Sequence, residues 1–140
     1  MLEFEITGVR VRLYFGFFAA VMLYLYIGGR TGACVEAALL SCLLHELGHL
    51  SAMLLFGCPP RRVSFYAGGI SISTRRINRL GRGARAVILS AGCAVNLLLA
   101  AVSYLLGLYG AAQINVTLAA FNLLPLPKLD GGRLLSLLKE

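Results

Sequence analysis

One uncharged stretch, from Ala86 to Pro127, constrains what this chain can fold into more than any other feature. At about 1.5 Å per residue, a single helix of that length would be about twice as long as a bilayer's hydrocarbon core of about 30 Å. The stretch must therefore fold back on itself, and the segment with Gly107, Gly110 and Gln113 is the natural place for the turn. We expect two membrane spans here, at roughly 86–106 and 112–126.

The composition of the whole chain agrees with a membrane protein. Of its 140 residues, 59% are hydrophobic and 14% are charged, whereas soluble domains have about 45–50% and about 25%. These values exclude a soluble globular domain and a disordered chain. Two further apolar runs, Leu13–Gly29 and Ala33–Gly57, are long enough to cross a bilayer. The prediction is an all-α polytopic membrane protein with about four transmembrane helices, organised as a single domain over residues 1–140.

The basic residues predict how the spans are oriented. The net charge is +7, and the 13 Lys and Arg residues lie in the flanks and loops between apolar runs, a pattern that indicates membrane orientation and no nucleic-acid partner. Only Arg30 lies on the side opposite to all the others. Under the positive-inside rule, both termini and the 58–85 loop are expected on the cytoplasmic side.

A short pattern in this loop is typical of a β-hairpin. Residues 63–74, VSFYAGGISIST, alternate β-branched and aromatic residues with small ones around Gly68 and Gly69. An ordinary cytoplasmic loop tethered by arginines is the alternative interpretation of the same residues.

Neither a cysteine framework nor a cleavable signal peptide is expected. The four cysteines have no close metal-type spacing, and three lie in or near apolar runs, so we expect no disulfide and no cysteine ligand: Cys34, Cys42, Cys58 and Cys93. The N-terminal residues MLEFEITGVRVR begin polar and acidic, which is unlike a signal peptide, so we expect the first apolar run to stay in the membrane.

The sequence HELGH at 45–49 carries the strongest chemical signal. Residues four apart lie on one face of a helix, so His45 and His49 can bind one metal ion, and Glu46 beside them can take a proton from water. The alternative is a pair of core histidines. That alternative needs separate partners for three adjacent polar groups inside a membrane, where ionisable groups are costly.

A catalytic zinc site usually has a third protein ligand. Of the six acidic residues, three are terminal, Glu36 lies about two turns from His45, and Glu46 serves as the base, which leaves Asp130. Asp130 follows Pro125 and Pro127, which break the fourth span. Broken backbone at membrane depth is tolerated where it lines protein or a water-filled cavity. A carboxylate that caps the following helix is the alternative role for Asp130.

Several ordered motifs together resemble the site-2 protease family of intramembrane zinc metalloproteases. They are HELGH, GGI at 68–70, AGCAVN at 91–96 and FNLLPLPKLDGGRLL at 121–135, and the resemblance extends over about residues 8–138. Within this family, the chain resembles the small bacterial members without a PDZ domain, which include a stage IV sporulation protease. Cys93 and Lys128 stand where many members have proline.

The resemblance implies an intramembrane metalloprotease core with Zn²⁺ bound by His45, His49 and Asp130 and with water activated by Glu46. It further implies that Asn96 and Asn122 lie near the site and hold the substrate backbone. The alternative is that each asparagine only links helices by hydrogen bonds. The expected partners are a membrane-protein substrate, such as a membrane-associated transcription factor precursor, and a membrane inhibitor or regulator. The expected location is the bacterial cell or forespore membrane.

Two other functions fit the same residues. A catalytically silent membrane scaffold would keep the fold, although the complete ligand set and Glu46 argue against it. A membrane metal transporter would also use intramembrane histidines and carboxylates, but the 86–127 stretch offers few polar residues for a pathway. The chain ends at Glu140, soon after the aspartate motif, which fits either a minimal core or a truncated protein.

Overall fold

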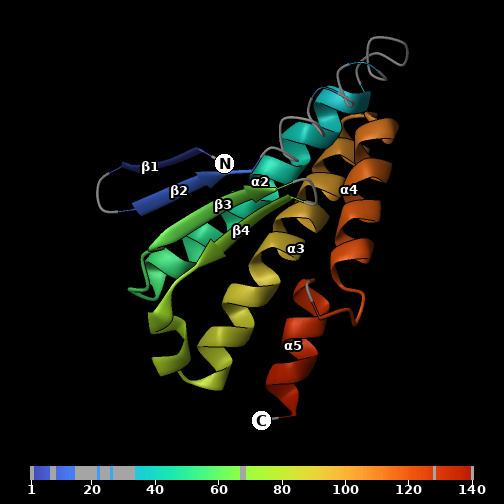
Figure 1. The fold of residues 1–140 in the computed structure, drawn as a ribbon. Helices are drawn as coiled ribbons and strands as arrows, with labels where there is room; N and C mark the ends of the chain where they lie inside the picture. Colours follow the sequence, from blue (N-terminus) through green and yellow to red (C-terminus); the bar gives the residue numbers. More distant parts are fainter. Residues whose placement is uncertain are drawn as a thin grey trace.

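The computed structural model describes residues 2–6, 9–14, 22, 26, 34–66, 69–127 and 129–139. The elements within these residues run in chain order as shown in Figure 1: β1 (Leu2–Ile6), β2 (Val9–Leu13), α2 (Cys34–Leu55), β3 (Arg62–Tyr66), β4 (Gly69–Ser73), η1 (Arg75–Arg79), α3 (Arg82–Leu105), α4 (Tyr109–Asn122) and α5 (Asp130–Leu138).

Helices α2 and α3 correspond to the second and third expected spans. They supply the two stretches in the described residues that are long and apolar enough to cross a membrane, Glu36–Leu55 and Arg82–Leu105. Each helix ends two residues before a glycine with positive φ, Gly57 (66°) after α2 and Gly107 (74°) after α3. After α2, the backbone N–H of Gly57 donates to the backbone oxygen of Leu54 at 3.0 Å, and that of Cys58 donates to the backbone oxygen of Met53 at 2.8 Å. Glycine stops the helix here because it adopts this conformation without steric cost.

Helix α4 corrects the expected fourth span. It begins at Tyr109 and ends at Asn122, so Gly110 and Gln113 lie inside the helix and Gly107 alone makes the turn. Its 14 residues give a length of about 21 Å, which is short of the roughly 20 residues that a transmembrane helix needs. The helix ends before the two prolines because proline cannot continue the hydrogen-bond pattern. The first expected span, Leu13–Gly29, lies almost entirely outside the described residues.

The sheet is the largest departure from the all-α expectation. The hairpin expected in the 58–85 loop is confirmed as β3 and β4, but it belongs to a four-stranded sheet in the order β1-β2-β3-β4. Strands β1 and β2 form a second antiparallel hairpin, and β2 runs parallel to β3. Glu3 lies opposite Arg12, and their side chains form a pair of contacts at 3.1 and 3.2 Å. The alternating charges of the N-terminal residues therefore match across the two strands.

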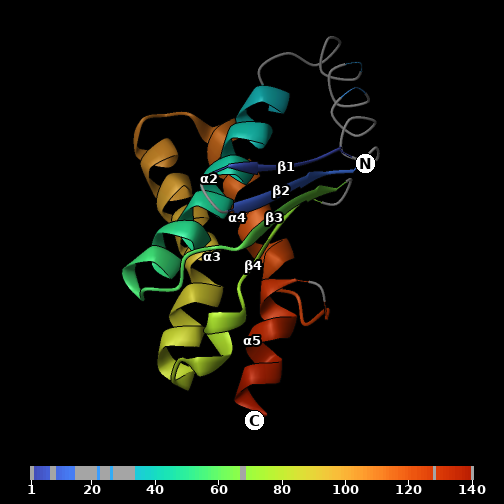
Figure 2. The same cartoon turned by 60° about the vertical axis from the view of Figure 1, so that its left-hand side comes forward.

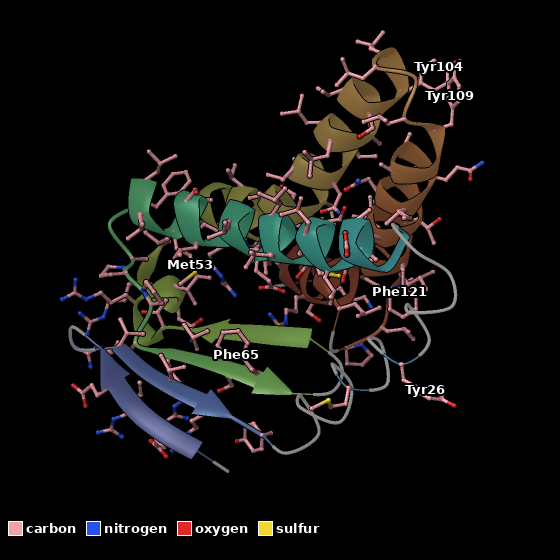
Figure 3. The ribbon with its side chains drawn as sticks, turned by 90° about the horizontal axis from the view of Figure 1, so that it is seen from above. Tyr26, Met53, Phe65, Tyr104, Tyr109 and Phe121 are labelled. Carbon is pink, nitrogen blue, oxygen red and sulfur yellow. The ribbon has the colours of Figure 1, made fainter. Side chains whose placement is uncertain are left out.

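The helices pack together, with the sheet beside them. Helix α3 contacts α2, α4 and α5, and α2 also contacts α4 and β4. In the view from above, the sheet lies along one side of α2, with β4 nearest to the helices and β1 farthest away (Figure 3). After rotation of the view by 60°, α5 follows below α4 and leads to the C-terminus (Figure 2).

Large apolar side chains point outward from the helices, as in a protein surrounded by lipid. Leu55 at the end of α2 is 85% exposed and Leu105 at the end of α3 is 83% exposed. Soluble monomers rarely expose so much contiguous apolar surface, whereas bilayer hydrocarbon would cover it. The arrangement supports the assignment to a membrane protein.

Candidate metal centre

The two histidines of the HELGH sequence lie on the face of α2 that points into the helix bundle. His45 is buried at 5% exposure, and His49, one turn later, is half-buried. Their Nε2 atoms are 3.2 Å apart. The helical spacing alone brings both imidazoles to one point.

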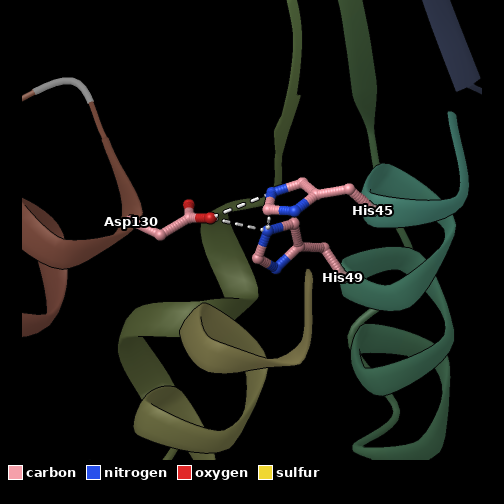
Figure 4. A group of neighbouring side chains, drawn as sticks. All are labelled: His45, His49 and Asp130. Carbon is pink, nitrogen blue, oxygen red and sulfur yellow. Dashed lines mark hydrogen bonds and ion pairs between the residues drawn. The ribbon is translucent and has the colours of Figure 1, made fainter. Parts of the chain in front are cut away.

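Asp130 reaches the same point from a different helix. It is the first residue of α5, and its Oδ2 lies 3.1 Å from Nε2 of His45 and 3.0 Å from Nε2 of His49 (Figure 4). The residue at the cap position of α5 is Leu129, and no side chain caps the helix. The carboxylate of Asp130 therefore faces the histidines, and the alternative role as a helix cap is not the one that the structure shows.

The other nitrogen of each imidazole is tied to α3. Nδ1 of His49 lies 2.7 Å from the backbone oxygen of Ile88, and Nδ1 of His45 lies 3.0 Å from Oδ1 of Asn96. Carbonyl oxygens only accept hydrogen bonds, so in this arrangement both Nδ1 atoms donate. A neutral imidazole carries one N–H, and each Nε2 then presents a lone pair to the centre.

This arrangement of donor atoms fits a metal ion. Two nitrogen lone pairs and a carboxylate oxygen at 3.0–3.2 Å from one another form a cluster of electron-pair donors that a bound cation would stabilise. In a tetrahedral zinc site with bonds of about 2.0–2.1 Å, neighbouring ligand atoms are about 3.3 Å apart. Within the described part of the chain, His45, His49 and Asp130 form a group of side chains that could hold a metal ion, with their ligand atoms within 4.8 Å of one another.

Glycines make room for the three ligands. A Cβ on Gly92 of α3 would collide with Nε2 of both His45 and His49. A Cβ on Gly131 would collide with the backbone oxygen of Leu123, and one on Gly132 with that of Leu126. Gly92 thus leaves the space that the imidazoles occupy, and the glycine pair lets α5 begin directly against the preceding loop.

Glu46 lies beside this centre. It is partly buried on α2, and its carboxylate is close enough to interact electrostatically with His45, His49, Asp130 and Arg133. It forms no hydrogen bond with another described residue, so its oxygens remain available to accept a proton.

The two asparagines that the resemblance assigned to the substrate occupy different surroundings. Asn96 is fully buried, at 0% exposure, and contacts His45. Asn122 is half-buried at the end of α4, where its Nδ2 donates to the backbone oxygen of Leu118 at 3.0 Å. No described contact joins Asn122 to the three converging residues. The substrate role of both residues stays a prediction.

Several features of the centre were missed in the sequence. The Sγ atom of buried Cys93 lies 4.0 Å from Oδ2 of Asp130, although Cys93 is outside the metal-binding group. The Ile88 carbonyl and the space at Gly92 were also missed. Small residues in AGCAVN were a signal for close helix packing. The described cysteines Cys42, Cys58 and Cys93 are free.

Comparison with known proteins finds two similarities, one in sequence and one in fold. Residues 107–140 match peptidase family M50. Among solved structures, the chain is similar to the site-2 protease from Methanocaldococcus jannaschii, with a TM-score of 0.74 and 22% identity, over 96% of this chain and 69% of that one. A search of curated proteins finds no match.

The two matches contribute different information. At 22% identity, the structural match establishes the fold over nearly the whole chain. The family match adds sequence similarity for the C-terminal part, which contains Asp130. Together they show that the chain has a fold similar to that of a site-2 protease and that its C-terminal part is similar in sequence to peptidase family M50.

Proposed function

We propose that this protein is an intramembrane zinc metalloendopeptidase, in which His45, His49 and Asp130 hold the ion. The observation that carries the proposal is the convergence of two imidazole lone pairs and one carboxylate oxygen from α2 and α5. The described parts of α2 and α3 around this centre are apolar enough to lie in a membrane.

Each polar group has a separate role in the proposed reaction. When bound, zinc supplies a Lewis acid that polarises a peptide carbonyl and makes water nucleophilic at neutral pH. Glu46 accepts the proton from the attacking water and delivers it to the departing amine nitrogen. Its lack of a hydrogen-bond partner among the described residues leaves its oxygens free for this transfer.

The proposed substrate is a transmembrane or membrane-proximal segment of another membrane protein. An intact helix keeps its carbonyl groups hydrogen-bonded and shielded, so the segment has to be locally unwound at the cleavage site. A transcription factor precursor as substrate, a membrane regulator, a role in sporulation and a cell- or forespore-membrane location remain predictions from the resemblance. The cytoplasmic location of both termini remains a prediction from the distribution of basic residues.

The proposal is tested with Glu46→Gln and its matched control Glu36→Gln, an exposed glutamate on the same helix. The purified proteins are mixed with a tagged single-span peptide that contains glycine and proline near its centre, and cleavage and zinc content are measured on the same preparations. Glu46→Gln should retain zinc and lose cleavage by a factor of about 10²–10⁴, because glutamine cannot accept the proton. Glu36→Gln should cleave as the wild type does.

Asp130→Ala supplies the second part of the test and should lose most of its zinc, since one of three ligands is removed. Cleavage by zinc-loaded Glu46→Gln at the wild-type rate would disprove the proposed role of the base. Full zinc occupancy in Asp130→Ala would show that a different residue is the third ligand.

A further inference from the structure

Three residues of α3 form a stripe that faces the two histidines. Ile88, Gly92 and Asn96 are spaced by four, so they lie on one face of the helix. Ile88 binds Nδ1 of His49 through its backbone oxygen, and Asn96 binds Nδ1 of His45 through its side chain. Gly92, between them, leaves the space for both Nε2 atoms.

The hydrogen-bond acceptors at the two ends of this stripe respond differently to a side-chain substitution. The Ile88 acceptor is backbone and persists with any side chain, whereas the Asn96 acceptor is a side-chain amide. Asn96 is the described residue whose side chain is most completely buried, at 0% exposure, and its Nδ2 has no hydrogen-bond partner among the described residues. A buried amide with an unpaired donor is destabilising, so stability alone gives little reason for it.

We propose that Asn96 is a positioning residue: its Oδ1 holds the proton of His45 on Nδ1 and thereby directs the Nε2 lone pair at the metal. This inference rests on the proposed function and assigns Asn96 to the ligand His45 instead of to the substrate backbone. Groups that accept from the second nitrogen of a metal-binding histidine fix its tautomer and orientation, and their loss typically weakens metal affinity by about 10–100-fold.

The chain offers a closely matched control. Asn115 on α4 is also buried, at 2% exposure, and also has an unpaired side-chain atom, Oδ1, but its Nδ2 donates to the backbone oxygen of Ala111 on its own helix at 2.9 Å. Asn96→Leu and Asn115→Leu therefore remove the same group from equally buried positions. Only the first substitution removes a partner of His45.

The first measurement is zinc affinity without any substrate, by competition of each purified protein with a chelator of known affinity. Asn96→Leu should bind zinc about 10–100-fold more weakly than Asn115→Leu. Asn96→Asp keeps an acceptor at the same place and should retain at least the wild-type affinity. Equal zinc affinity of Asn96→Leu and Asn115→Leu would overturn the proposal.

The second measurement is ¹⁵N NMR of the imidazoles in metal-free protein, which is simple because the chain has only two histidines. In the wild type and in Asn115→Leu, the neutral His45 should carry its proton on Nδ1, and in Asn96→Leu this preference should be lost. A wild-type His45 protonated on Nε2 would refute the proposal even if Asn96→Leu failed to fold. Neither measurement depends on cleavage, so a protein that binds zinc in this way and cleaves nothing would contradict the peptidase function alone.

Discussion

At the scale of single residues, the centre depends on where side chains are missing as much as on where they are present. His45 and His49 meet Asp130 because α2 and α3 approach closely, and that approach is possible because Gly92 carries no Cβ. On the other side of the same contact, a Cβ on Gly48 of α2 would lie 2.8 Å from Cγ2 of Val95 and 3.0 Å from the backbone oxygen of Ala91. Small residues on both helices thus determine how closely α2 and α3 approach each other and how near the imidazoles lie to α3.

This packing leads to a prediction for Gly92→Ala. The added methyl group would occupy the position of both Nε2 atoms, so we expect zinc content and cleavage to fall at least tenfold while the helices still form. The control is Gly83→Ala on the same helix, where nothing lies within 4 Å of the new Cβ. This control should bind zinc normally and be slightly more stable, by up to about 1 kcal/mol, because alanine favours helix. Normal zinc binding by Gly92→Ala would contradict the described contact.

At the scale of elements, the break between α4 and α5 positions the third ligand. Helix α4 ends at Asn122, and α5 begins at Asp130, so the aspartate stands at the start of a new helix. A continuous helix would place this residue farther along the axis of α4. This separate start of α5 therefore brings the carboxylate to α2.

We predict that Gly132→Ala acts at this junction without touching the histidines. Its Cβ would collide with the backbone oxygen of Leu126 and displace the first turn of α5, which should lower zinc content severalfold. Gly110→Ala in α4 is the control, since its new Cβ has no neighbour within 4 Å. Zinc analysis reports whether the ligand Asp130 is displaced, and circular dichroism on both variants reports whether helix content is lost. Wild-type zinc content in Gly132→Ala would show that the junction tolerates the methyl group.

The elements also show which features could be predicted from sequence. Local sequence patterns predicted α2 with its two histidines, α3, and the hairpin of β3 and β4. Such predictions succeed because helix periodicity and turn residues depend on residues that are close together in the sequence. The pairing of β2 with β3 could not be predicted, since it depends on contacts between residues far apart in the chain. The contact of Asn96 with His45 depends in the same way on the packing of α3 against α2. The alternating charges of β1 and β2 were a local signal that had been interpreted only as a polar terminus.

At the scale of the whole molecule, the two ends of the helix bundle carry different residues. Helix η1, which contains arginines, and the C-terminus lie toward one end of the bundle, whereas the apolar α3–α4 connection at 106–108 lies at the other end (Figure 1). This asymmetry agrees with the charge pattern that predicts a cytoplasmic 58–85 loop.

The orientation can be tested by labelling single cysteines in a background without the four native ones. Exposed Arg79→Cys should react with an impermeant thiol reagent only after the cells are permeabilised. Leu106→Cys, 68% exposed at the other end, should react in intact cells. Both should react equally after permeabilisation, which controls for intrinsic reactivity. The reverse pattern would place the loop and both termini outside the cytoplasm.

The position of Asp130 has a consequence for the dynamics of the C-terminal helix. Helix α5 packs on α3, and Asp130 joins it to α2 through the same three atoms that fit a metal ion. A ligand that binds only the folded arrangement stabilises it by about 2.7 kcal/mol at a hundred times its Kd. Chelation should therefore raise amide deuterium uptake in 130–138 and leave the uptake of the middle of α3 unchanged. Equal uptake with and without chelator would mean that α5 stays packed on α3 without the ion. A selective rise would mean that the metal ion stabilises the tertiary structure in addition to its proposed catalytic role.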